Sequence, residues 1–194
     1  VCTHGIFSGA IYLLLPMKSS FIIAESCPIA MHGVRDWTER SLPDYSIAEA
    51  RSFKELNRAL ADRRYDLIVF DLELNDINSY QTIKRIIRLH LATRILVFSS
   101  RPGNVYAKRF IRVGANGFVS KQATQTQFVA AVQKVLASSA YMSDLEWLER
   151  DCILDLLSNN ELEVARMLAQ GAPVTEIAKA LRSSVSPISP YKTR

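Results

Sequence analysis

Short apolar runs alternate with amphipathic stretches along the first two thirds of the chain. Runs at residues 21–24, 67–70 and 94–98 are rich in Ile, Leu, Val and Phe, and their lack of polar breaks is typical of strands buried on both faces. Residues 45–48 and 117–120 indicate two shorter strands. Between the runs, apolar side chains recur three or four residues apart, as in helices that bury one face. The pattern therefore predicts five strand–helix units.

Turn and capping residues separate these units. Ser52 is followed three residues later by Glu55, and this spacing predicts a capping box at the start of the second helix. Gly114 is expected to end the fourth helix, and Thr124 is expected to open the fifth. Strand–helix units joined by right-handed crossovers predict an α/β, flavodoxin-like (βα)5 fold, with a parallel sheet in the order 2-1-3-4-5.

Polar groups follow the apolar runs, at the sheet edge where open α/β folds bind their ligands. Asp71 follows the third strand, Glu25 and Ser26 follow the first, Ser99 ends the fourth and Lys121 follows the fifth. A lone Asp in such a place most often caps a turn. Four strand ends that bring polar groups to one edge instead predict a shared site. Carboxylates, a lysine and a hydroxyl suit Mg²⁺ and phosphoryl chemistry, in which an Asp carboxylate accepts the phosphoryl group.

Composition changes this picture only slightly. The chain has 194 residues, 48% of them hydrophobic, which fits one large globular domain or two small ones. The formal net charge of +5 is mild and would suit an anionic partner. Three cysteines lie far apart, which fits a reducing cytoplasm and argues against a disulfide framework or a zinc site. The apolar stretch at 6–16 is too short to span a membrane, and we interpret residues 1–16 as a non-native-looking extension.

Residues 20–138 resemble the receiver domain of two-component response regulators, and we assign 17–138 to this domain. The resemblance implies that Asp71 is the phosphoacceptor and that Lys121 is the lysine of the phosphoryl site. It also implies that Ser99 and Phe118, the aromatic residue three positions before the lysine, act as the switch pair. The expected function is regulation of transcription in the cytoplasm, and not catalysis.

The acidic pocket departs from the receiver pattern. The resemblance implies a Mg²⁺ site formed by Glu25, Asp71 and the position of Ser26, where the family has a second acid. The loss of one negative ligand is expected to weaken Mg²⁺ binding, because ligand charge is a main source of affinity for a hard cation. Asn75 and Asp76 replace the usual Pro-Gly in the following loop. We therefore expect a degenerate receiver that is phosphorylated poorly or not at all.

The last part of the chain has a helical pattern. Residues 139–157 are expected to form a linker helix, because Leu145, Leu148, Ile153 and Leu156 have nearly helical spacing. Ser158 and Glu161 form a second Ser-x-x-Glu pair, which predicts another helix start. Two short helices joined by a tight turn then indicate a helix-turn-helix, although a plain helical hairpin has the same pattern.

Residues 158–194 resemble the LuxR-type (NarL/FixJ) DNA-binding domain, and the wording of both domains is most similar to the Bvg/Evg-type subgroup. The residues that carry the likeness are Leu157-Ser158, Glu161, Leu168-Ala169-Gln170-Gly171, Glu176-Ile177-Ala178 and Tyr191-Lys192-Thr193-Arg194. The resemblance implies DNA contacts from Ser189, Pro190, Lys192, Thr193 and Arg194. Pro190 is unfavourable within a helix, since it removes a hydrogen bond and clashes with the preceding turn. The family's recognition helix extends further and a fourth helix follows, so we expect a truncated domain.

Three classes of function are compatible with this sequence. The leading hypothesis is a response-regulator transcription factor, with promoter DNA, a sensor histidine kinase and a second subunit as partners. The alternative is a pseudo-receiver that acts by protein interaction or heterodimerisation, without phosphorylation or DNA contacts of its own. A flavodoxin-like enzyme or nucleotide binder is disfavoured, because no Gly-rich phosphate loop follows the first strand.

Overall fold

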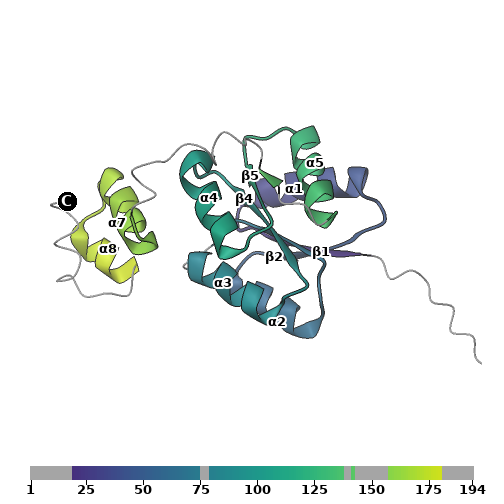
Figure 1. The fold of residues 1–194 in the computed structure, drawn as a ribbon, viewed down its shortest axis with the longest axis horizontal. Helices are drawn as coiled ribbons and strands as arrows, with labels where there is room; N and C mark the ends of the chain where they lie inside the picture. The colour runs from purple at the N-terminus through teal and green to yellow at the C-terminus, as the bar shows by residue number, and fades with distance from the viewer. Residues whose placement is uncertain (1–18, 75–78, 138–140, 143–156, 181–194) are drawn as a thin grey trace, which may run out of the picture.

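The computed structural model describes residues 19–74, 79–137, 141–142 and 157–180, and its strands form one parallel sheet (Figure 1). The strand order is β2-β1-β3-β4-β5-β6, so the predicted order 2-1-3-4-5 is confirmed. The strands are β1 (Ser20–Ala24), β2 (Ser46–Ala50), β3 (Leu67–Phe70), β4 (Arg94–Ser99), β5 (Gly117–Ser120) and β6 (Tyr141–Met142). The short β6 was not predicted. It pairs with β5 and lies at the start of the expected linker.

Helices cover both faces of the sheet. The first is α1 (Pro28–Ser41), followed by α2 (Phe53–Asp62), α3 (Ser79–Leu89), α4 (Gly103–Val113) and α5 (Gln125–Leu136). Side chains of α2, α3 and α4 pack in one apolar cluster with alternate residues of the strands, including Ile22, Ile68 and Phe118. Side chains of α1 and α5 pack in a second cluster with the other set of alternate residues, including Phe21 and Val69. Because both sheet faces are covered, the strand runs contain no polar break.

Capping residues set several of the helix ends as expected. Thr124 and Gln127 form a reciprocal capping box at α5. The Ser52 hydroxyl accepts from the Glu55 amide at α2, but the Glu55 carboxylate accepts from the amide of Arg51 instead of completing the predicted box. Gly114 ends α4 with φ of 112°, a left-handed conformation that glycine adopts without the penalty of a Cβ.

Two further helices follow, α7 (Asn159–Ala169) and α8 (Val174–Ala180), in agreement with the predicted small helical domain. Ser158 and Glu161 form the predicted capping box of α7. The helical spacing of the expected linker lies outside the described residues. Among the helices of the described ranges, none has the length and apolar character that crossing a bilayer requires.

Candidate functional site

Main-chain hydrogen bonds align the ends of β1 to β5 at one edge of the sheet. The amide of Glu25 donates to Ala50 at 3.0 Å, and the amide of Asp71 donates to Ala24 at 2.9 Å. The amide of Lys121 donates to the carbonyl oxygen of Ser99 at 2.9 Å. Each bond extends the ladder by one residue past a strand, so the side chains of Glu25, Asp71 and Lys121 start from fixed positions.

Lys121 joins the two carboxylates. Its Nζ lies 2.7 Å from Glu25 Oε2 and 3.0 Å from Asp71 Oδ2. Glu25 and Asp71 are each 2% exposed, and the Lys121 side chain is 17% exposed. Two buried carboxylates need a counter-charge, because isolated buried charges are strongly unfavourable. One ammonium shared by two carboxylates leaves the cluster with a formal charge of −1.

Burial and the neighbouring Glu25 carboxylate make Asp71 harder to ionise. Burial, followed by the charge of Glu25, raises the pKa of Asp71 from its ordinary value of 3.8 to about 6. Lys121 opposes both effects through its hydrogen bond and its charge. Burial lowers the pKa of Lys121, but its hydrogen bonds to Glu25 and Asp71 outweigh this, so its pKa is raised. Lys121 therefore stays charged, and Asp71 is the group whose ionisation varies.

The site has free acceptor capacity for a cation. Asp71 Oδ1 is buried and has no hydrogen-bond partner, whereas Glu25 Oε2 contacts the Lys121 ammonium at 2.7 Å. Glu25 Oε1 is fixed by the amide of Cys27, which donates to it at 2.8 Å. Hard oxygen atoms of this kind suit Mg²⁺. Within the described residues no group of three His, Cys, Asp or Glu side chains could hold a metal, so a cation here would rely on two carboxylates and water.

The structure also describes three other predicted site residues, Ser26, Ser99 and Phe118. Ser26 is partly exposed, and its hydroxyl is not among the groups that bind Lys121. Ser99 is wholly buried at the end of β4, where its hydroxyl accepts from the amide of Arg101 at 3.1 Å. Phe118 is wholly buried in the core cluster on the α2, α3 and α4 side. Asn75, Asp76 and the predicted DNA-contact residues at 189–194 lie outside the described residues.

Some contacts near the site were not anticipated from the sequence. The Ser100 hydroxyl donates to Glu73 at 2.7 Å, and this bond links the loop after β3 to the loop after β4. Arg101, next in the chain, places its guanidinium 5.1 Å from the Tyr106 ring centroid. Sequence spacing gives no signal for the Ser100–Glu73 contact, because it joins two loops whose distance depends on the folded sheet.

Arg101 also connects the receiver to α7. Its Nη1 lies 3.3 Å from Glu163 Oε2, and both side chains are largely buried. Leu162, also on α7, is buried in the apolar cluster that contains the α4 side chains. Burial raises the pKa of Glu163, but its hydrogen bond to Arg166 and the charges of Arg101 and Arg166 outweigh this and hold it below its usual range. The two domains therefore make a contact that combines an apolar side chain with an ion pair.

Comparison with known proteins agrees with this geometry. Residues 21–133 match the family profile of the response regulator receiver domain. The virulence regulator BvgA of Bordetella pertussis is 30% identical over 138 residues, which cover 66% of this chain and 66% of that protein. The Fimbriae Z protein of Escherichia coli K12 is 27% identical over 183 residues, which cover 90% of this chain and 87% of that protein.

Solved structures give the same result for the longer span. RcsB from Salmonella enterica serovar Typhimurium, bound to promoter P1flhDC in the presence of the phosphomimetic BeF₃⁻, has a TM-score of 0.73. It is 25% identical, and the match covers 91% of this chain and 89% of the RcsB chain. The likeness includes the segment of α7 and α8, because it extends well beyond the receiver residues.

Proposed function

The chain belongs to the response regulator receiver family, and from this premise we propose that it is a transcription regulator of the LuxR class that accepts a phosphoryl group slowly on Asp71. The observation that carries the proposal is the contact of Lys121 with both Glu25 and Asp71, beside an Asp71 oxygen that has no partner. A receiver needs a nucleophilic carboxylate, a cation-binding acid and a fixed lysine at one place. This edge of the sheet supplies all three.

Each side chain has a distinct role in the proposal. Asp71 Oδ2, which Lys121 vacates, attacks the phosphorus of a donor, and the leaving group departs on the opposite side with the electrons of the broken bond. Lys121 moves from the carboxylates toward the new phosphoryl oxygens and offsets their charge. The buried Ser99 hydroxyl donates to one of these oxygens. Glu25 and the free oxygen of Asp71 would hold Mg²⁺, which when bound supplies positive charge against the anionic donor.

The missing second acid makes this receiver slow. Ser26 occupies the position where the family has an acid, and a hydroxyl contributes no charge to cation binding. The raised pKa of Asp71 would also slow phosphorylation, because near pH 6 part of the protein carries a protonated, non-nucleophilic Asp71. Bound Mg²⁺ would favour the ionised form of Asp71 and reverse this effect.

We propose that Arg101 transmits the phosphorylation state to the C-terminal helices. Its amide donates to the Ser99 hydroxyl, and its guanidinium pairs with Glu163 on α7. A Ser99 hydroxyl that turns toward a phosphoryl oxygen would disturb the first bond and thereby the second. The C-terminal segment would then bind promoter DNA, as RcsB does in its complex with promoter P1flhDC, with a second subunit as partner and a sensor kinase as phosphoryl donor.

A phosphorylation assay tests the proposal directly. The full chain is incubated with Mg²⁺ and acetyl phosphate, and intact mass is followed with time beside the Ser26→Asp variant. We expect slow, partial addition in the wild type and at least roughly tenfold faster addition in Ser26→Asp, because a carboxylate restores a charged ligand. Asp71→Asn is the matched control and should gain no mass.

Two results would contradict this reading. Rapid stoichiometric modification of the wild type would remove the slow-receiver proposal. Modification that persists in Asp71→Asn would place the acceptor elsewhere.

A second candidate is a pseudo-receiver that acts only through protein contacts. The specific observation in its favour is Ser26, which weakens the metal pocket. Titration of the full chain into labelled duplex DNA at several salt concentrations separates the two candidates. A transcription regulator should bind with affinity that falls steeply with salt, because phosphate contacts release counterions. No binding even at low salt, together with no phosphorylation, would favour the pseudo-receiver.

A further inference from the structure

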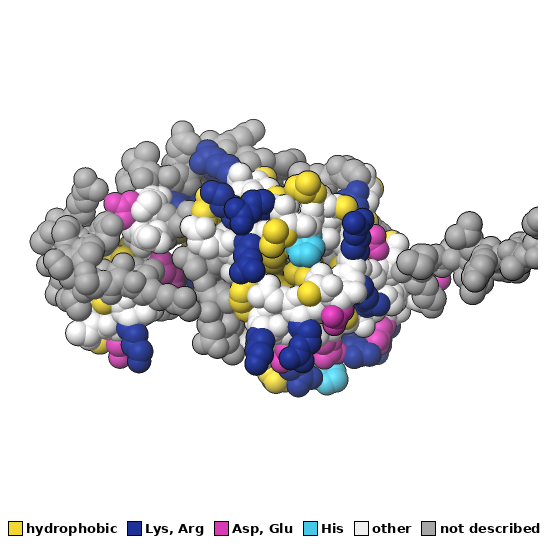
Figure 2. All heavy atoms as spheres, turned by 90° about the horizontal axis from the view of Figure 1, so that it is seen from below, with side chains coloured by type: hydrophobic (Ala, Val, Ile, Leu, Met, Phe, Trp, Pro, Cys, Tyr) yellow, Lys and Arg dark blue, Asp and Glu magenta, His cyan; other side chains and the backbone are white. Residues whose placement is uncertain are grey.

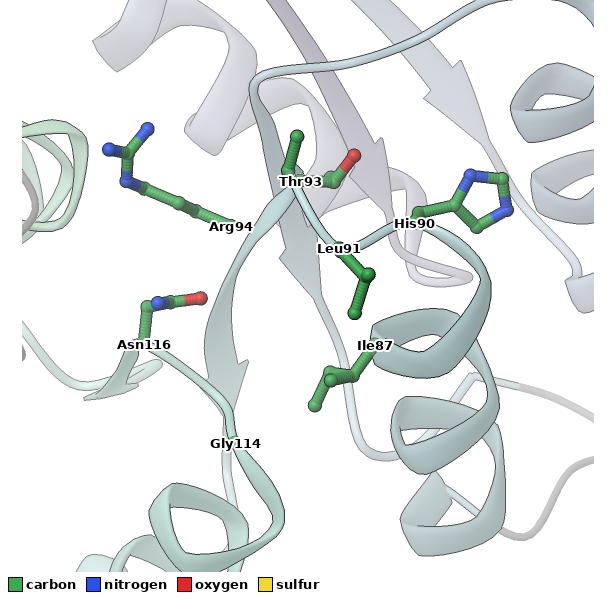
Figure 3. Close-up of a pocket in the computed structure, with 8 residues that line it drawn as sticks. Ile87, His90, Leu91, Thr93, Arg94, Gly114 and Asn116 are labelled. Carbon is green, nitrogen blue, oxygen red and sulfur yellow. The ribbon is translucent and has the colours of Figure 1, made fainter.

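A hollow of about 490 Å³ opens at the edge of the sheet opposite Asp71 (Figure 3). It lies where α3 and α4 end and where β4 and β5 begin, and Leu91, Thr93, Gly114 and Asn116 are among the residues that line it. β4 has six residues, so the length of a strand, roughly 20 Å, separates the hollow from the phosphoryl site. In the close-up, Leu91 extends toward Ile87, whereas His90 and Arg94 point away on opposite sides.

One exposed leucine lines the hollow, and a second lies two residues before it in the chain. Leu91 is 85% exposed and Leu89, at the end of α3, is 58% exposed. Across the described residues, Ile29 at the start of α1 is the only other exposed large hydrophobic side chain. Exposed leucines two residues apart in the chain are more typical of a surface that a partner covers than of an ordinary solvated surface.

The stretch of chain that forms most of the hollow is rich in cations, although Arg101 and Arg109 are bonded to Glu163 and to the Leu157 carbonyl oxygen and do not line the hollow. Residues 79–116, which include α3, β4 and α4, contain no Asp or Glu. Their basic residues are Lys84, Arg85, Arg88, Arg94, Arg101, Lys108, Arg109 and Arg112. This formal charge of +8 exceeds the +5 of the whole chain, so the remaining residues carry a net −3. Figure 2 shows Lys and Arg side chains around hydrophobic side chains and a histidine on one face of the molecule, with Asp and Glu side chains in its lower part.

The fold itself contains an example of what binds such a surface. Near the beginning of α4, the α7 helix inserts Leu162 into the apolar cluster and pairs Glu163 with Arg101. The partner there is a leucine next to a glutamate. The neighbouring ends of α3 and α4 offer the same kinds of side chain: exposed Leu89, Leu91 and Arg88 at the end of α3 and exposed Arg112 at the end of α4. Within the described residues no acidic side chain pairs with Arg88 or Arg112.

We propose that the surface formed by Ile87, Arg88, Leu89, Leu91 and Arg112, here called the basal surface, binds an acidic segment of a partner protein that carries leucine-type side chains. Charge complementarity selects the acidic residues, and the exposed leucines require apolar side chains among them. Nucleic acid fits less well, because a phosphate backbone would leave both leucines uncovered. The basal surface lies away from Asp71, so it can bind its partner in either phosphorylation state.

Fluorescence anisotropy with a defined probe tests this proposal. The probe is a fluorescein-labelled synthetic peptide that repeats Leu-Glu-Glu-Leu, titrated with the full chain. Two control peptides carry Ala for Leu and Lys for Glu. We expect the acidic leucine peptide to bind with a dissociation constant on the order of 10–100 μM, as for a small transient surface, and both controls to bind at least roughly tenfold more weakly.

Protein variants locate the binding on the molecule. Leu91→Ala should weaken binding roughly tenfold, and since Leu91 is exposed the variant should fold normally. Arg88→Glu should weaken binding several-fold at low salt and less at high salt. Ile29→Ala and Lys54→Glu are the matched controls, because they change an exposed apolar residue and an exposed cation on other helices. Both should bind like the wild type.

Several results would overturn the proposal. These are no binding of the acidic peptide, equal binding of the Ala-for-Leu peptide, or equal losses in the control variants. Displacement of the peptide by mixed-sequence duplex DNA, with DNA affinity sensitive to Arg88→Glu and insensitive to Leu91→Ala, would make nucleic acid the partner. Sedimentation that shows a dimer lost in Leu91→Asp would make a second copy of this chain the partner.

Discussion

The ionisation of Asp71 is set by three neighbouring influences of opposite sign. Burial and the Glu25 carboxylate disfavour the charged form, and Lys121 favours it. The net result is a pKa of about 6 in place of 3.8, so the ionised form of Asp71 destabilises the folded protein. An acid with a raised folded-state pKa produces no penalty below its unfolded pKa, and the penalty increases as pH rises from about 4 to about 6.

Asp71→Asn should therefore stabilise the metal-free protein at neutral pH. We expect a gain of about 1–3 kcal/mol in the free energy of unfolding at pH 7.5, and a clearly smaller gain at pH 4.5. Lys121 keeps its pair with Glu25 in this variant, so no new unpaired charge arises. Urea unfolding at the two pH values provides the measurement. Asp44→Asn, in the exposed loop after α1, is the control. A loss of stability at pH 7.5 would contradict the expected sign.

Magnesium should offset the ionisation penalty of Asp71 in the wild type and therefore stabilise it. Cation binding to the free oxygen of Asp71 removes the penalty and adds binding energy to the folded state. We expect millimolar MgCl₂ to raise the melting temperature of the wild type at pH 7.5 and to leave Asp71→Asn almost unchanged. The same concentration of KCl separates specific binding from ionic strength. An equal shift in both proteins would place the cation elsewhere.

Among the structural elements, two helices contain or end at a glycine, and the two glycines have different effects on stability. Gly33 lies inside α1, where an added Cβ meets nothing within 4 Å. Gly114 ends α4 at φ of 112°, and its Cβ would approach Ile87 Cδ1 at 3.0 Å. The first glycine costs helix stability, and the second permits a conformation that other residues adopt with strain.

The same substitution should therefore have opposite effects at the two positions. Gly33→Ala should stabilise the protein by about 0.5–1 kcal/mol through helix propensity. Gly114→Ala should destabilise it by about 1–2 kcal/mol through left-handed backbone strain. Thermal unfolding of the two variants under identical conditions is the measurement. If both changes had the same sign, the assignment of Gly114 as a required left-handed residue would be wrong.

Strands and helices were predictable from the sequence where apolar spacing alone determines them. The runs that became β1, β3 and β4 are buried on both faces, and caps such as Thr124 and Ser158 lie at the predicted helix starts. The short β6 was not predictable. Tyr141 and Met142 have no strand pattern of their own, and they pair because β5 presents an open edge beside them. Tertiary context determines such short elements.

The candidate site divides in the same way. Glu25, Asp71 and Lys121 were predictable together, since each follows an apolar run and parallel strands end at one edge. Arg101 was not, because its role depends on the position of α7, which no local pattern encodes. The basal surface was also missed: the sequence contains its charge pattern, but exposure of Leu89 and Leu91 is known only once the helices are packed.

At the scale of the whole molecule, α7 contacts the receiver through the Arg101–Glu163 pair and through Leu162 in the apolar cluster that contains the α4 side chains. The Arg101–Glu163 pair is largely shielded from water, so it should contribute more than an exposed pair. The lowered pKa of Glu163 means that its stabilising contribution is present above its ordinary value of 4.5 and is lost as pH falls through the folded-state value. Domain contact should therefore weaken in acid.

Arg101→Ala should release α7 from the receiver without unfolding it. We expect amide hydrogen exchange in α7 to become several-fold faster in this variant. Local opening of α7 costs less free energy when it no longer has to break the Arg101–Glu163 ion pair. Arg51→Ala, which removes an exposed pair with Glu49 at 3.5 Å, is the matched control and should leave α7 unchanged. Unaltered α7 exchange in Arg101→Ala would show that Leu162 alone maintains the contact.

The small strand β6 decides where this protein can be divided in the laboratory. The Tyr141 amide donates to Asn116 at 3.0 Å, and Tyr141 lies opposite Gly117 on the neighbouring strand. A receiver fragment that stopped at residue 138 would leave the β5 main chain uncovered, and such an edge is a template for strands of other molecules. A fragment that includes Met142 keeps β6, which covers this edge. Fragments that end at residue 138 and at residue 142 should thus differ in their tendency to aggregate on storage.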